Sequence, residues 1–472
     1  MPSLADAQVA LGALDGRYRS AVAPLVDHLS EPALNRERLR VEVEWLIYLT
    51  AHQVIPGCGT LTADEQSALR AIPARFGPDD IAELAEIEAE TNHDVKAVEY
   101  LLKRRFAALP GRSEDDPLTE LIHFGATSED VNNLSYALMI RGAITQVWLP
   151  AARALLAQVE AMAGALRAVP LLAHTHGQPA TPTTMGKELA VLTWRLGRQL
   201  ARIERAEYLG KFNGATGTYG AHLAAVPDAD WQRISAEFVG SLGLTWNPLT
   251  TQIESHDWQA ELYADLARFN RILHNLCTDV WTYISLGYFA QVRGQGTIGS
   301  STMPHKVNPI RFENAEANLE VSNALLDVLA ATLVTSRLQR DLTDSSMQRN
   351  VGTAIGHSLL ALDNVARGLS GLDADPGAMA ADLDANWEVL AEPIQSAMRA
   401  LAAQGVPGMA NPYERLKELT RGRRIGAREL REFIEGLGLP ADVAARLTTL
   451  TPQTYVGLAP QLVDRVVPPT TG

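Results

Sequence analysis

Apolar side chains recur at steps of three, four or seven residues in three stretches of this 472-residue chain. The longest series lies within 258–290 and runs Leu262, Leu266, Phe269, Leu273, Leu276 and Val280. The other two series run Leu189, Leu192, Leu196, Leu200 and Ile203, and Leu319, Leu326, Leu329 and Leu333. This spacing places one apolar stripe along each helix and is typical of long helices that pack in a bundle.

Strand patterns along the chain are few and short, and no alternation of strands with helices indicates a parallel sheet. We therefore expect an all-α protein built around a bundle of long helices. Two stretches, 109–117 and 369–376, carry the proline, glycine and polar residues typical of boundaries. They predict an N-terminal helical domain (1–116), a central long-helix domain (117–370) and a small C-terminal helical domain (371–472).

Charge and composition narrow the classes of partner. A formal net charge of −14 and a pI near 5.3 argue against nucleic-acid binding, because neutralising phosphates requires clustered lysine and arginine. Cys58 and Cys277 lie far apart without metal-ligand spacing, so the sequence predicts neither a disulfide framework nor a metal site. The first residues show neither a basic start nor an apolar h-region, so we expect no secretory leader, and no apolar run approaches the roughly 20 residues that span a bilayer. We expect a soluble, cytoplasmic protein that binds no membrane.

The densest group of reactive side chains lies at 299–313, which reads Gly-Ser-Ser-Thr-Met-Pro-His-Lys-Val-Asn-Pro-Ile-Arg-Phe-Glu. A glycine beside Ser300 and Ser301 favours exposed backbone amides, which can bind an anion or stabilise a developing negative charge. Lys306 adds a fixed positive charge, so either serine could become a base. The alternative interpretation is a surface turn, since Ser, Pro and Asn favour turns for local reasons.

A second set of candidate catalytic side chains lies at 174–182, which reads His-Thr-His-Gly-Gln-Pro-Ala-Thr-Pro. Its two imidazoles could supply a general acid near neutral pH, or the pair could be incidental. The prolines predict an irregular stretch, followed by a helix that starts near Met185.

The string at 299–313 resembles, without a gap, the signature of the fumarase/aspartase superfamily, whose members eliminate fumarate from succinyl-bearing substrates. The block at 175–180 resembles the adenylosuccinate lyase family, and further matches over almost the whole chain resemble the bacterial type of that family. The resemblance implies a fumarase/aspartase-like fold of three helical domains, whose central bundle forms the core of a homotetramer. It also implies active sites shared between subunits and no cofactor.

By this resemblance Ser300 is the catalytic base, and His176 is the acid that protonates the leaving nitrogen. Lys306 and Asn308 would bind a substrate carboxylate and neighbouring polar groups. The other implied substrate contacts are Arg17, Tyr18, Asn92, His93, Asp94, Thr127, Ser128, Gln252, Asn314, Arg340, Ser345 and Arg349. Taken alone, these motifs have simpler interpretations: a turn at 15–18, helix starts at 91–96 and 127–133, and a solvated charge run at 336–346.

The resemblance implies a carbon–nitrogen lyase of purine nucleotide biosynthesis. It would cleave adenylosuccinate into AMP and fumarate, and SAICAR into AICAR and fumarate, by β-elimination. Two alternatives stay open: a lyase of the argininosuccinate lyase or aspartase type, which shares the 299–313 signature, and a non-catalytic scaffold of the same fold. The presence of both His176 and Ser300 argues against the scaffold.

Overall fold

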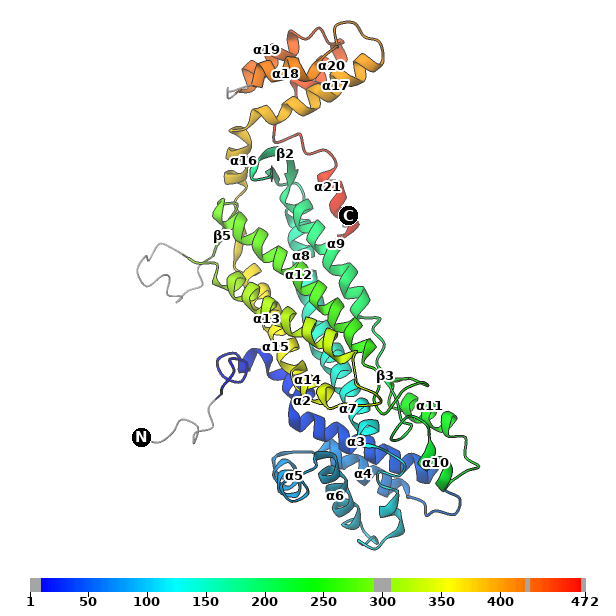
Figure 1. The fold of residues 1–472 in the computed structure, drawn as a ribbon. Helices are drawn as coiled ribbons and strands as arrows, with labels where there is room; N and C mark the ends of the chain where they lie inside the picture. The colour runs from blue at the N-terminus through cyan, green and yellow to red at the C-terminus, as the bar shows by residue number, and fades with distance from the viewer. Residues whose placement is uncertain (1–9, 293–306, 421–424, 468–472) are drawn as a thin grey trace, which may run out of the picture. The chain divides into compact units, whose positions relative to one another are not determined.

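The computed structural model describes residues 10–292, 307–420 and 425–467. This part of the chain is predominantly helical, as the apolar spacing predicts, and its strands form three two-stranded sheets (Figure 1). Among its helices, none combines the length and hydropathy needed to cross a membrane. The chain divides into two compact units. The first comprises Met1–Ala152, Gln199–Arg271 and Ala317–Asp363, and the second comprises Arg153–Arg198, Ile272–Glu316 and Asn364–Gly472.

Several long helices contribute residues to both units. They are α8 (Leu149–Ala165), α9 (Met185–Ile203), α12 (Asp257–Ser285), α13 (Ile310–Leu333) and α15 (Val351–Leu369). The three predicted apolar series fall on α9, α12 and α13, and every residue of the three series is buried. The prediction of long helices with one buried stripe is therefore confirmed.

Buried polar side chains connect four of the helical segments within the first unit. Trp148, at the end of the π-helical turn η4 (Ala143–Trp148), donates through Nε1 to Oγ of Ser358 in α15 at 2.9 Å. Ser358 donates to Oδ1 of Asn270 in α12 at 2.8 Å, and Asn270 Nδ2 donates to Ser322 Oγ in α13 at 3.1 Å. Because a buried polar group without a partner costs about 1–3 kcal/mol, this chain of bonds favours one register of the helices.

The remaining helices of the first unit pack around α3 (Glu31–Ala51). It contacts α4 (Ala63–Ala74), α6 (Asp94–Ala107) and α7 (Ser128–Gly142), and α5 (Pro78–Thr91) contacts α6. The other elements of this unit are α1 (Arg19–Val22), η2 (Ala23–Leu25), α2 (Val26–Leu29), η3 (Pro117–Leu121), β3 (Leu209–Gly210), α10 (Gly220–Ala225), α11 (Trp231–Ser241), β4 (Thr245–Trp246) and α14 (Thr343–Gln348).

Trp45 of α3 fixes two irregular segments that lead into the candidate site. Its fully buried indole packs against Phe212, after β3, with ring centroids 4.3 Å apart, and against Phe238 of α11 at 4.8 Å. Its Nε1 donates to the carbonyl oxygen of Phe124 at 2.9 Å. Since aromatic side chains bury large areas, this contact holds the segments before α7 and after β3 on one core.

In the second unit, β1 (Pro170–Thr175) and β2 (Gln178–Thr184) form an antiparallel hairpin, so the expectation of an irregular stretch at 174–182 is wrong. His176 and Gly177 form the turn with φ of 53° and 72°, the combination of a type I′ turn. Prolines are tolerated because both strands of a two-stranded sheet are edge strands. The expected helix start near Met185 is confirmed by α9.

The C-terminal part of the second unit is a set of short helices with its own hydrophobic cluster, which includes Leu383, Met398, Leu430 and Leu447. Strand β5 (Phe289–Gln291) pairs with β6 (Leu372–Ala374) in an antiparallel sheet. The other elements are α16 (Pro376–Asp384), η5 (Trp387–Leu390), α17 (Ala391–Ala403), α18 (Pro412–Thr420), α19 (Ala427–Glu435), α20 (Ala441–Thr448), α21 (Ala459–Leu462) and η6 (Val463–Arg465). The division into three domains stays a prediction.

Candidate active site

Asp94, the first residue of α6, lies between two arginines of the first unit. Its Oδ2 accepts a hydrogen bond from Arg38 Nη2 at 2.7 Å and lies 3.9 Å from Arg349 Nη2. Burial works to raise the pKa of Asp94, but the charge and hydrogen bond of Arg38 outweigh it and hold the pKa below its ordinary value. Asp94 is therefore an anion at neutral pH, suited to accept hydrogen bonds and unsuited to donate a proton.

Hydrogen bonds continue from Arg38 to the predicted substrate contacts Arg340 and Gln252. Arg38 donates to Asn132 Oδ1 at 2.9 Å, and Asn132 donates to Glu129 Oε1 at 2.9 Å. Arg340 Nη2 lies 3.0 Å from the same oxygen of Glu129, and its Nη1 donates to Gln252 Oε1 at 3.5 Å. The network thus connects four predicted substrate contacts, which are Asp94, Gln252, Arg340 and Arg349.

Thr127 and Ser128 begin α7, as the capping pattern predicts. Thr127 is the N-cap residue, and its backbone N–H donates to Asp130 Oδ2 at 2.9 Å. Ser128 is the first residue of the helix, and both hydroxyl-bearing side chains are half-buried. The start of a helix presents unpaired amides and the positive end of the helix dipole, so this position can bind an anionic group.

Asp130 fixes the helix start through four donors. Besides Thr127, its carboxylate accepts from the backbone N–H groups of Asn213 and Gly214, each at 3.0 Å, and pairs with Lys211 Nζ at 2.8 Å. The side chains of Asp130 and Lys211 are both fully buried. Gly214 has φ 82°, a left-handed conformation that glycine adopts freely. The carbonyl oxygen of the next residue, Ala215, accepts a hydrogen bond from Gln252 Nε2 at 2.9 Å. The buried carboxylate of Asp130 therefore holds the start of α7 and the segment 211–214 together.

Asn92 and His93 connect α5 to α6. Asn92 ends α5 in the left-handed conformation with φ 50°, and His93 is the N-cap of α6, where its Nδ1 accepts from the backbone N–H of Lys96 at 3.2 Å. The interpretation of this motif as a helix start is confirmed. Both side chains are exposed, so this capping role is compatible with contact to a ligand.

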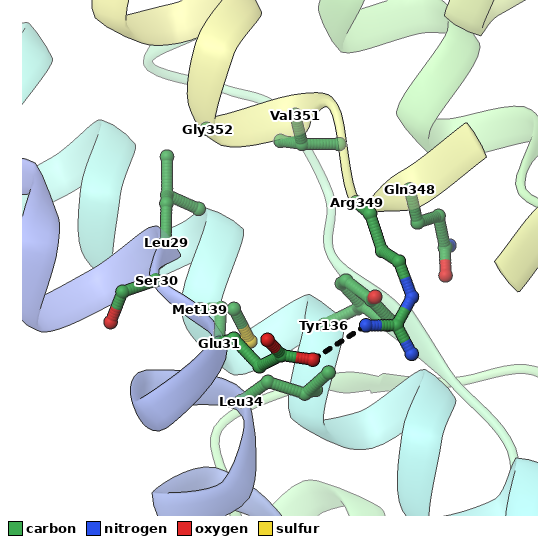
Figure 2. A pocket seen from close by; sticks show the side chains of 10 residues that line it. All are labelled: Leu29, Ser30, Glu31, Leu34, Tyr136, Met139, Gln348, Arg349, Val351 and Gly352. Atoms are coloured by element: carbon green, nitrogen blue, oxygen red, sulfur yellow. Dashed lines mark hydrogen bonds and ion pairs between the residues drawn. The ribbon is translucent and has the colours of Figure 1, made fainter. Parts of the chain in front are cut away.

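A cavity of about 190 Å³ lies beside Arg349 at the end of α14. Figure 2 shows Arg349 directed toward Glu31, whose Oε1 accepts from Nη1 at 2.6 Å. Tyr136 and Gln348 also line the cavity, together with Leu29, Leu34, Met139 and Val351. Burial raises the pKa of Tyr136 to about 12, so its hydroxyl stays protonated at neutral pH. The cavity therefore combines apolar walls with a guanidinium, a carboxylate, a phenol, an amide and a hydroxyl.

The N-terminal turn lies beside this cavity, and Ser345 precedes its lining residues Gln348 and Arg349 in the chain. Asp15 lines a neighbouring cavity together with Arg349, which brings the predicted turn at 15–18 to the same part of the first unit. Arg17 is exposed and Tyr18 is half-buried, just before α1. Ser345, half-buried in α14, donates its backbone N–H to Asp344 Oδ1 at 2.7 Å.

The other predicted site residues belong to the second unit or lie outside the described residues. His176 is exposed at the turn of the β1–β2 hairpin, Asn308 is exposed just before α13, and Asn314 is half-buried in α13. Ser300 and Lys306 lie outside the described residues. The catalytic and substrate-binding roles of all the predicted site residues stay predictions.

Comparison with known proteins identifies the family. A protein-family model described as "Lyase" matches residues 16–321, and one described as "Adenylosuccinate lyase C-terminal" matches residues 336–456. An adenylosuccinate lyase of Escherichia coli strain K12 is 50% identical over 97% of this chain and 98% of its own length. The chain belongs to the adenylosuccinate lyase family. The predicted membership of the bacterial type and the predicted lyase activity are confirmed.

Further relatives agree with this adenylosuccinate lyase assignment and with the fold. The adenylosuccinate lyase of Vibrio cholerae serotype O1 is 48% identical over 98% of this chain and 99% of its own length. A solved fumarate lyase from Mesorhizobium sp. BNC1 is 21% identical and covers 94% of this chain and 96% of its own, with a TM-score of 0.72. The predicted all-helical fumarase/aspartase-like fold is confirmed. The argininosuccinate lyase or aspartase alternative is not favoured.

His123 is a candidate site residue of this adenylosuccinate lyase family member that sequence reasoning missed. Its Nδ1 lies 2.5 Å from Oε1 of the buried Glu42, and its backbone N–H donates to Oε2 at 3.0 Å. Burial lowers the pKa of His123, but the hydrogen bond and charge of Glu42 outweigh it and raise the pKa above its ordinary value. The backbone has φ 63°, an uncommon conformation for histidine. The one feature of the sequence that could have indicated His123 is its position four residues before Thr127, a predicted substrate contact.

Proposed function

We propose that this chain cleaves adenylosuccinate into AMP and fumarate by β-elimination, and that it converts SAICAR into AICAR and fumarate in the same way. The observation that carries the proposal is 50% identity to an adenylosuccinate lyase over 97% of the chain. The match to the C-terminal model of that family supports it. In the first unit, Arg340 and Arg349 supply guanidinium groups, which suit the phosphate and carboxylates of an anionic nucleotide.

In the proposed reaction, Ser300 takes a proton from the succinyl carbon next to a carboxylate. The electron pair left on that carbon becomes the second carbon–carbon bond of fumarate as the carbon–nitrogen bond breaks, and His176 gives a proton to the leaving nitrogen. Lys306 and Asn308 stabilise the negative charge that builds on the carboxylate between these steps. A serine is a weak base, so neighbouring backbone amides and Lys306 must favour its alkoxide.

The active assembly in this proposal is a cytoplasmic homotetramer whose sites each combine residues from several subunits, without a cofactor. The resemblance to the superfamily supports the shared site. The position of His176 on an exposed hairpin turn also supports it, because a side chain at such a turn is available to a neighbouring subunit. Neither nucleic acid nor membrane is a partner in this proposal.

The substrate is tested by following fumarate release in the ultraviolet from adenylosuccinate, argininosuccinate and aspartate. We expect release from adenylosuccinate alone, with a loss of about 10²-fold or more in kcat for Ser300→Ala and for His176→Ala. Ser301→Ala and His174→Ala are the matched controls, because each alters the neighbouring residue of the same type, and both should keep most of the activity. Release from another substrate would overturn the nucleotide assignment, and silence from all three would favour the scaffold.

The shared site is tested by mixing inactive His176→Ala and Ser300→Ala chains. If each site takes its acid and its base from different subunits, exchange creates some sites that contain both groups, and activity returns in part. Labelled subunits confirm that exchange has occurred. Exchange without any return of activity would show that acid and base come from the same chain.

A further inference from the structure

A cluster of buried polar side chains in the first unit takes no part in the proposed chemistry. Glu254, His256, Gln259, Asp344 and Gln348 are each 6% exposed or less. They come from the segment that follows Gln252, from the first turn of α12 and from α14. Because buried polar groups are retained where they are hydrogen-bonded, their arrangement defines which segments lie together.

The backbone of His256 is held in an uncommon conformation where the Gln252 segment turns into α12. Its φ is 61°, in the left-handed region that histidine seldom adopts. Its N–H donates to Oε2 of Glu254 at 2.8 Å, and Oε1 of Glu254 accepts from Asn247 Nδ2 at 2.9 Å. A buried carboxylate thus fixes this turn, and the turn fixes the position from which the imidazole projects.

The imidazole of His256 contacts both neighbouring helices. Nε2 lies 3.4 Å from Oδ2 of Asp344 in α14. Nδ1 lies 3.3 Å from the side-chain amide nitrogens of Gln259 in α12 and Gln348 in α14. An amide nitrogen can only donate, so Nδ1 accepts these bonds and Nε2 carries the proton that Asp344 accepts. The ring therefore joins α12 to α14 in one defined tautomer.

Both partners of His256 in α14 precede a predicted substrate contact. Asp344 comes directly before Ser345, and Gln348 comes directly before Arg349. Gln348 also lines the cavity into which Arg349 extends (Figure 2). The position of α14 against His256 therefore sets where these two groups lie.

We propose that His256 is a positioning residue, which holds the Gln252 segment and α14 in register. Gln252 lies four residues before it, and Arg340 already bonds Gln252 at 3.5 Å, so the two segments meet at the substrate-binding network. The proposal rests on the proposed function, because it assumes that these groups bind adenylosuccinate. A small displacement of several binding groups weakens the hold on the substrate, so losing His256 raises KM more than it lowers kcat.

The test uses the full chain carrying His256→Asn. Asparagine tolerates the left-handed backbone, but its shorter side chain cannot reach Asp344. KM for adenylosuccinate should rise about tenfold, the equivalent of one hydrogen bond to a charged group, whereas kcat should change by less than about threefold. His357→Gln is the matched control, because His357 is a half-buried histidine of α15 whose Nδ1 contacts Asn318 at 2.7 Å. It should leave KM unchanged.

Asp344→Leu removes the acceptor from the other side and keeps a branched side chain of similar shape. If His256 acts through Asp344, the double variant has a KM no higher than that of the more affected single variant. Additive increases in KM overturn the proposal, as does an unchanged KM in both single variants with only a lower melting temperature. Wild-type protein measured alongside distinguishes a failure of the positioning role from a failure of the proposed function. An active wild type with unchanged KM in the variants refutes only the positioning role, whereas a wild type that releases no fumarate overturns both.

Discussion

Asp130 and Lys211 form an ion pair from which solvent is fully excluded, whereas Glu31 and Arg349, in the same unit, form one that is largely open to solvent. The side chains of the first pair are 0% exposed, and those of Glu31 and Arg349 are 70% and 48% exposed. The N···O distances are similar, at 2.8 and 2.6 Å. The two ion pairs therefore have similar geometry but differ in their access to water, and this difference determines how easily each pair dissociates.

The buried pair is a permanent part of the framework. Besides Lys211, the Asp130 carboxylate accepts three backbone N–H groups, so a break would strand charges and amides without water. Such an arrangement positions Thr127 and the segment 211–214. The exposed pair has water as an alternative partner on both sides, so its dissociation costs little. An arginine held in this way is free to exchange Glu31 for a substrate anion.

Removing one partner of the buried pair should have the largest effect on stability. Lys211→Met keeps most of the side-chain volume but leaves Asp130 without its counter-charge, and we expect a loss of about 3–5 kcal/mol in the free energy of unfolding. Urea denaturation measures it. Lys96→Met is the control, because Lys96 is 44% exposed and its partner Glu99 keeps Lys103 at 3.3 Å. A loss for Lys211→Met as small as the control would contradict the framework role.

Removing the exposed arginine should affect substrate binding and spare the fold. Arg349→Met deletes a guanidinium that can form charge-assisted hydrogen bonds, so KM for adenylosuccinate should rise about tenfold to a hundredfold. The free energy of unfolding should fall by less than about 1 kcal/mol, as for other exposed ion pairs. Fumarate release and urea denaturation on the same preparation separate the two effects. A large loss of stability with an unchanged KM would reverse the comparison.

The sequence could predict the features of this molecule that depend on residues close together in the chain. The helices of the bundle were predictable because burial repeats locally, as in the series from Leu262 to Val280, all 1% exposed or less. Thr127 and His93 were predictable as helix starts because capping involves neighbours within three residues. These features need no knowledge of distant segments.

The partners that organise the candidate site were not predictable, because they come from distant parts of the chain. Arg38 reaches Asp94 across 56 residues and Asn132 across 94, and nothing in its local pattern marks it as buried. In the sequence nothing distinguishes Lys211 from a solvated lysine, and only the folded structure shows that its side chain is fully buried. The hairpin of His176 was missed for a related reason, since its prolines read as breakers unless the edge position of both strands is known.

The pair formed by the half-buried His123 and the buried Glu42 should show an intermediate effect that depends on pH. The folded-state pKa of His123 is raised, so the pair contributes fully below the unfolded value of about 6.5, and the contribution disappears as pH rises through the folded-state pKa. The difference in unfolding free energy between wild type and His123→Gln should therefore shrink by about 1 kcal/mol between about pH 6 and pH 9. Urea denaturation across this range measures it.

His222 supplies the matched control for the sign of this effect. His222 is buried, but neither ring nitrogen has a hydrogen-bond partner among the described residues. Burial lowers its pKa, so its contribution is present above about pH 6.5 and is lost as pH falls. The two histidine variants should therefore show opposite trends with pH. The same trend for both would mean that Glu42 does not determine the ionisation of His123.

The smallest effect should come from removing the carboxylate of the exposed pair. Glu31→Gln should change the free energy of unfolding by less than about 1 kcal/mol, because the pair is exposed and Glu31 adds only a modest interaction with the start of α3. In the proposed function Arg349 binds the substrate, so Glu31 would compete with the substrate for Arg349, and KM for the variant should fall by no more than about fivefold. Salt screens this competition, so the KM values of variant and wild type should converge as ionic strength rises. A higher KM in the variant would instead mean that Glu31 orients Arg349 for the substrate, which would make the exposed pair part of the framework as well.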